Sequence, residues 1–119
     1  MKSVNKVILL GNLGRDAETA QTPSGSSVTK FSVATSTRWR DQQSQEWKEA
    51  TNWTNVVMWK NENVAQQLKK GTQVYLHGRL QTRSYTDNSD KKVYVTEVVA
   101  EDVIVLGSAR AQQVDDGWN

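Results

Sequence analysis

Apolar and polar residues alternate along much of the chain, and a period of two is typical of β-strands with one buried face. The alternation is clearest where Val74, Leu76 and Leu80 fall on one side and polar, basic and aromatic residues on the other. The pattern predicts strands over residues 28–36, 51–62, 72–85 and 93–107, the last being one strand or a pair. Each would bury one face and expose the other.

The first strand departs from this alternation. Within residues 4–14, the run from Val7 to Leu10 is apolar at both parities. A strand that is apolar on both faces is usually covered on both. In a chain of this size one cover is the barrel core, and we expect a second subunit to supply the other.

One segment has a helical period instead. Residues 61–71 carry a single apolar stripe of Val64, Ala65 and Leu68. Asn61 stands where a helix N-cap is expected. The segment predicts a short helix between the third and fourth strands.

The resulting order is three strands, one short helix and two more strands. An all-β chain with one short helix in that place has the layout of the OB-fold, a five-stranded Greek-key barrel. Residues 37–50 are polar without a sustained period and are interpreted as a long exposed loop or a hairpin tip, and residues 86–92 as a turn-rich loop. We expect one domain over residues 1–107 and a short flexible tail over 108–119.

Composition narrows the chemistry. The chain has 119 residues with no Cys and one His, so we expect no disulfide, no metal site and no cofactor. No apolar run approaches the roughly 18 residues of a membrane span, and the N-terminus lacks a secretory cleavage pattern. We therefore expect a cytoplasmic protein without membrane contact. The net charge is only +2, so attraction to a polyanion depends on where the charges lie.

Four aromatic residues have no evident place in the predicted core. Trp53 and Trp59 are six residues apart, so in a strand they point to the same face, opposite Val56 and Met58. The four residues are Trp39, Trp53, Trp59 and Tyr85. Basic residues are interleaved with them: Arg38, Arg40, Lys48, Lys60, Arg79 and Arg83. Flat rings among cations suit an unstacked nucleic acid strand, whose bases stack on rings while its phosphates are neutralised.

Other interpretations exist for individual residues. Trp47 lies in a charged segment, where a single Trp is more often a packing anchor for a loop. His77 is more often a surface residue than a ligand or base. An OB-fold nuclease would need a tight carboxylate cluster to hold a metal. The adjacent pairs Glu101-Asp102 and Asp115-Asp116 are interpreted as surface and tail, so we expect no enzyme.

Several blocks together carry a family resemblance. They are VNKVILLGNLGRD, STRWRD, NWTNVVMW, LKKGTQVYLHGRLQTRSYTD and VYVTEVVAEDV. In this order they closely resemble the bacterial-type single-stranded DNA-binding proteins over residues 3–107. The resemblance implies a non-catalytic, largely sequence-independent binder of single-stranded DNA in replication, recombination and repair, associated with the nucleoid.

The resemblance also implies roles for particular residues. The positions that match the family's stacking aromatics are Trp39, Trp53, Trp59 and Tyr85. Those matching its phosphate contacts are Lys6, Lys48, Lys70 and Arg83. The family usually forms a homotetramer whose dimers pair through the first strand, which implies an interface at Val4, Lys6, Val7, Ile8, Leu9 and Leu10.

The end of the chain departs from the family pattern. The family usually carries a long Gly/Pro/Gln-rich linker and an acidic tip that recruits replication and repair enzymes. The ending QQVDDGWN matches only roughly, through Asp115, Asp116 and Trp118. The alternative is therefore a tail-less accessory or primosome-type OB-fold subunit. Such a subunit would tend to lose stacking rings, and here all four positions are aromatic.

Overall fold

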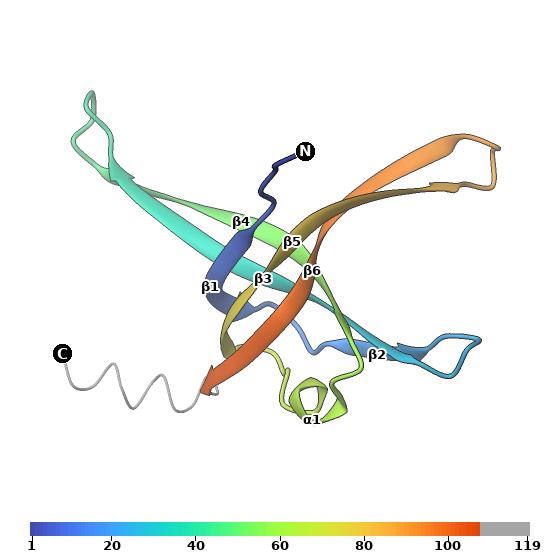
Figure 1. The fold of residues 1–119 in the computed structure, drawn as a ribbon. Helices are drawn as coiled ribbons and strands as arrows, with labels where there is room; N and C mark the ends of the chain where they lie inside the picture. Colours follow the sequence, from blue (N-terminus) through green and yellow to red (C-terminus); the bar gives the residue numbers. More distant parts are fainter. Residues whose placement is uncertain (108–119) are drawn as a thin grey trace.

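The structure is a computed structural model that describes residues 1–107. It contains β1 (Val7–Leu13), β2 (Glu18–Gln21), β3 (Ser27–Arg40), β4 (Trp47–Trp59), α1 (Glu62–Ala65), β5 (Gln73–Thr86) and β6 (Lys92–Gly107) (Figure 1). No helix within residues 1–107 is long and apolar enough to cross a membrane. The predicted tail, residues 108–119, lies outside the described residues.

The five long strands close into a barrel. They follow the order β1-β5-β6-β4-β3, and β1 returns to β3 through the pairs Asn12↔Ala34 and Leu13↔Val33. β4 and β6 run parallel where Val56 faces Val98, and the other pairings are antiparallel. This arrangement is the OB-fold, so the predicted fold class is confirmed.

The strands differ from the prediction at two places. The segment 37–50 is not a long loop, because β3 and β4 stay paired as far as Arg40↔Trp47 and leave only a turn at 41–46. The hairpin-tip interpretation is the correct one. β2 was missed altogether, since its four residues are all exposed and pair only with β3. Neither stretch needs an apolar face, because strand pairing and polar side-chain contacts hold it, such as Thr19 with Thr29 and Lys48 with Asp41.

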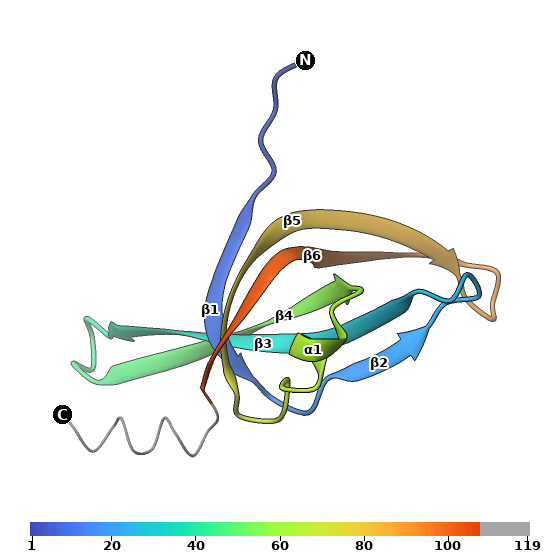
Figure 2. The ribbon, with the colours of Figure 1, turned by 60° about the horizontal axis from the view of Figure 1, so that its bottom comes forward.

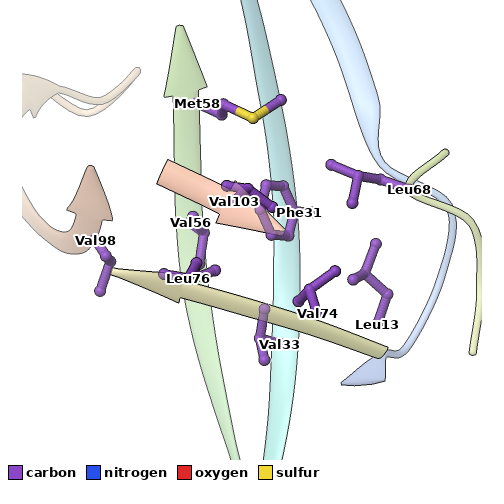
Figure 3. Close-up of a cluster of buried hydrophobic side chains, with 10 residues drawn as sticks. All are labelled: Leu13, Phe31, Val33, Val56, Met58, Leu68, Val74, Leu76, Val98 and Val103. Carbon is purple, nitrogen blue, oxygen red and sulfur yellow. The ribbon is translucent and has the colours of Figure 1, made fainter. Parts of the chain in front are cut away.

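The core fills the barrel interior from the alternating faces of the strands (Figure 3). Its fully buried members include Val33, Val56, Val74 and Leu76. They come from β3, β4 and β5, and each lies on the apolar side of an alternating segment. The alternation in the sequence therefore indicated which side of these strands is buried.

The predicted helix over residues 61–71 is shorter than expected. α1 ends at Ala65, and Asn61 makes no side-chain capping hydrogen bond. The Ser27 hydroxyl donates instead to Glu62 Oε1 at 2.6 Å, tying the first turn to β3. The predicted apolar stripe is confirmed, because Leu68 is fully buried and its two helical partners pack against the core.

Two hairpins, β3–β4 and β5–β6, extend away from the barrel in different directions (Figures 1 and 2). Each turn is organised by an aspartate. Asp41 Oδ1 accepts from the Gln43 N–H at 2.9 Å, and Asp87 Oδ1 accepts from the Ser89 N–H at 2.8 Å. The polar segments that interrupt the alternation of apolar residues are therefore the turns at the two hairpin tips.

A close approach between β5 and β6 depends on Gly78. The register shifts between His77, opposite Asp102, and Gly78, opposite Ala100. A Cβ on Gly78 would fall well inside van der Waals contact of the Val99 carbonyl oxygen. We predict that Gly78→Ala lowers the free energy of unfolding by about 1–3 kcal/mol, as overpacking does.

Urea denaturation followed by circular dichroism measures this loss. Leu80→Ala is the control, since Leu80 lies on the same strand but is half exposed, and its loss should be smaller. A Gly78→Ala protein with the parent's urea midpoint would show that the strands separate there without cost.

Candidate nucleic-acid interface

Three tryptophans share one side of β4. Trp59 lies opposite Val28, Trp53 opposite Ala34 and Trp47 opposite Arg40, so the indoles recur every six residues on the face away from the core. We call this side the outer face of the β3–β4 ribbon. Its exposed rings and cations are Trp47, Trp53, Trp59, Lys30, Arg38 and Arg40. The predicted common face of Trp53 and Trp59 is confirmed, with exposures of 58% and 48%.

Trp53 rests on a residue without a side chain. A Cβ on Gly14 would fall within van der Waals contact of the far edge of the indole, at Cζ3 and Cη2. A pocket of about 210 Å³ opens beside the ring, lined by Gly14, Arg15, Ser32 and Trp53. Gly14 therefore positions the ring while most of its surface stays open to a ligand.

Trp39 faces the other way. It lies opposite Lys48, on the continuation of the core face beyond the barrel, and is 44% exposed. Lys48 Nζ is 3.0 Å from Asp41 Oδ2. The Gln43 N–H, and then the Lys48 ammonium, lower the pKa of the Asp41 carboxyl. Lys48 is therefore already paired with the Asp41 carboxylate when it contacts a phosphate.

Tyr85 lies on the β5–β6 hairpin, half exposed, on the same side of β5 as Arg79 and Arg83. The Arg83 Nε–H donates to both carboxylate oxygens of Glu97 at 3.2 and 3.3 Å. Glu97 is buried, with 6% exposure. The pairing fixes Arg83 and offsets its charge, so the predicted phosphate ligand also has a structural task.

A second pocket of about 210 Å³ lies between the ribbon and this hairpin. Its polar lining includes Arg15, Lys30, Asn55, Arg83 and Glu97. The carboxylates of Asp16 and Glu18 also line it. Within residues 1–107, however, no group of three or more His, Asp or Glu side chains is placed to hold a metal.

The remaining predicted cations are exposed but dispersed. Lys60 directly follows Trp59, with a positive φ of 57° and its N–H bonded to the Ser27 carbonyl at 3.1 Å. Lys70 lies beyond α1, and its backbone N–H donates to Asp16 at 2.8 Å. Lys6 precedes β1 and Arg79 lies in the middle of β5. The structure thus distributes the predicted phosphate residues around the barrel.

Sequence reasoning missed part of the outer face. Trp47 is not a packing anchor, because its side chain is 62% exposed at the end of β4. Lys30 and Arg15 were not predicted as site residues, although both are exposed. Both line the pocket next to Arg83, and Arg15 also lines the pocket next to Trp53. For Trp47, the signal in the sequence was its spacing of six residues from Trp53, the same as from Trp53 to Trp59.

Comparison with known proteins gives a consistent assignment. The sequence model of the Single-strand binding protein family matches residues 4–106. The chain belongs to this family. A solved structure described as "Plasmodium falciparum SSB complex with ssDNA" is similar with a TM-score of 0.78 and 32% sequence identity, covering 90% of this chain and 98% of that one. The family resemblance inferred from the sequence blocks is thereby confirmed.

The seat of Trp53 on Gly14 leads to a test of ring placement. Gly14 lies outside the left-handed φ region, and the atoms that an added Cβ would meet are at the far end of a side chain. We predict that Gly14→Ala moves the indole while leaving the urea midpoint close to the parent's. Binding of oligo-dT, followed by fluorescence titration, should weaken several-fold.

Trp53→Ala in the Gly14→Ala background is the control. The two changes act on one ring, so their effects should be clearly less than additive. Full additivity of the two losses would contradict a role for Gly14 through Trp53.

Proposed function

We propose that this protein coats and protects single-stranded DNA in the cytoplasm, without catalysis and largely without sequence preference, during replication, recombination and repair. The observation that carries the proposal is the outer face of the β3–β4 ribbon. There Trp53 and Trp59 are about half exposed and flanked by cations, on a member of the single-strand binding family. The Plasmodium falciparum protein was solved in a complex with single-stranded DNA, which supports the same ligand here.

Stacking supplies the sequence-tolerant part of the binding. Every base has a π-face, and each stacked base contributes about 1–3 kcal/mol as judged by alanine substitution. Trp53 and Trp59 are six residues apart, or roughly 20 Å along an extended strand. Trp39 and Tyr85 lie on the two hairpins, which project in different directions. We infer that the DNA curves around the molecule to reach all four rings.

Cations supply the second part. The predicted phosphate ligands are all exposed in the structure: Lys6, Arg38, Arg40, Lys48, Lys60, Lys70, Arg79 and Arg83. Lys48 and Arg83 are paired with Asp41 and Glu97, which orients their N–H donors and offsets their charge. Trp39 lies opposite Lys48 on the β3–β4 hairpin, and Tyr85 lies two residues from Arg83 on the β5–β6 hairpin. Each hairpin therefore offers a base platform and a phosphate ligand side by side.

A homotetramer is part of the proposal. Ile8 and Leu10 are 58% and 55% exposed on the outer side of β1. Their cross-strand partners are His77 and Tyr75, and Ile104 of β6 continues the apolar surface. Within the described chain, residues 7–11 pair with β5 on one edge only. An open edge and an apolar face on one strand both favour a second copy.

We predict that single-stranded oligo-dT strongly quenches the Trp fluorescence and that a duplex of equal length does so weakly. Trp53→Ala should weaken the single-strand affinity by about 1–3 kcal/mol because one stacking platform is lost. Trp53→Phe, which keeps a ring, should retain most of it. Equal affinity for the single strand and the duplex would refute the stacking mechanism.

For assembly, we predict that sedimentation of the parent at micromolar concentration gives a species four times the 13.4 kDa chain mass. Ile8→Glu should sediment as smaller species, since a charge on an apolar subunit contact is costly to bury. Circular dichroism of Ile8→Glu should stay like the parent's because Ile8 is exposed in the single chain. A parent that sediments only as a monomer would sink this part of the proposal.

A further inference from the structure

Trp47 continues the line of indoles on β4 beyond the family positions. It precedes Trp53 by the same six residues that separate Trp53 from Trp59, and it points to the same outer face. Its side chain is 62% exposed, more than either of the other two. A ring of this size left open on a solvent face has no packing role in the single chain.

The ring is nevertheless held in place by its neighbours. The guanidinium carbon of Arg38 lies 5.3 Å from the indole centroid, within cation–π range. Arg38 is diagonal to Trp47 in the ribbon, because Arg40 is the residue directly opposite. Arg40 is itself anchored, since its Nε–H donates to the Gln45 carbonyl at 3.2 Å. The exposed ring therefore sits on a guanidinium and beside a second, fixed cation.

The chemistry of this surface favours a nucleic acid strand over a protein contact. Around Trp47 the outer face carries Ser36, Arg38, Arg40, Glu49 and Thr51, with no aliphatic side chain among them. The centre of a protein interface is depleted in charge and rich in apolar neighbours. A base needs only a free ring face, and its phosphates need the cations beside it.

We propose that Trp47 is an additional stacking platform, with one DNA base on the open face of its indole and the adjacent phosphates next to Arg38 and Arg40. This inference rests on the proposed function. Trp47 lies roughly 20 Å along β4 from Trp53. At about 3.4 Å per stacked nucleotide that distance corresponds to at most about six nucleotides. The DNA path would thus run from the barrel out along the β3–β4 hairpin.

The first test measures affinity against oligo-dT length. An oligomer just long enough to contact Trp53 and Trp59 does not reach Trp47. The Trp47→Ala protein should therefore bind this short oligomer with the parent's affinity. With oligomers longer by about six nucleotides or more, Trp47→Ala should weaken binding about fivefold or more, the equivalent of one lost base stack. Trp47→Phe should recover most of the affinity.

Tyr94→Ala is the matched control. Tyr94 is also an exposed ring with a cation over it, at 66% exposure and 5.6 Å from Lys92 Nζ. It lies opposite Ser84, on the side of its hairpin away from Tyr85. Its removal should leave affinity unchanged at every length.

The second test reads the ring directly. A variant with Trp39, Trp53, Trp59 and Trp118 all changed to Phe keeps the stacking rings but leaves Trp47 as the sole indole. Its fluorescence should be quenched by long oligo-dT and stay unchanged with the short oligomer.

Several results would overturn the inference. They are an unquenched Trp47 at all lengths, an affinity loss in Trp47→Ala that is the same for short and long oligomers, or no loss at all. A changed sedimentation coefficient of Trp47→Ala with unchanged DNA affinity would assign the ring to a subunit contact instead. Failure of the parent to bind any oligo-dT would reject the proposed function itself, which is a distinct outcome.

Discussion

The pairing of β3 with β4 is the constraint on which the rest of the structure depends. The two strands stay in one register from Val28↔Trp59 to Arg40↔Trp47. Because side chains alternate, that register sends Phe31 and Val56 into the core and Trp53 to solvent. A slip of one residue would exchange the two sets. Core stability and the ligand surface are therefore fixed by the same hydrogen bonds.

The ribbon changes character where it leaves the barrel. Inside, one face is covered by the core, while beyond Ser36 both faces are exposed. An isolated two-stranded hairpin is marginally stable in water. Here the Asp41 turn and its contact with Lys48 close the tip. The extension can thus present Trp39 on one face and Trp47 on the other without a core of its own.

The sequence was sufficient for the fold because the barrel strands are half buried and their apolar residues alternate. It also placed Trp53 and Trp59 correctly, since a spacing of six keeps both on one face. It missed β2 and the outer part of the β3–β4 pairing, where the strands need no apolar residue and the sequence has no period of two. The seat of Trp53 on Gly14 and the Arg83–Glu97 pair join residues far apart in the chain. No spacing rule reports contacts of that kind.

The distribution of charge explains how a chain with a net charge of only +2 can suit a polyanion. Glu97 and Asp41 do not simply cancel cations, because each fixes its partner beside an exposed ring: Arg83 near Tyr85, and Lys48 opposite Trp39. Such pairs contribute little long-range attraction, so they do not collect counterions as a bare basic patch would. The two pairs instead hold the N–H donors of Lys48 and Arg83 in place beside Trp39 and Tyr85. Under the proposed function, stacking supplies the affinity that salt does not screen, and the paired cations set where the phosphates between the stacked bases lie.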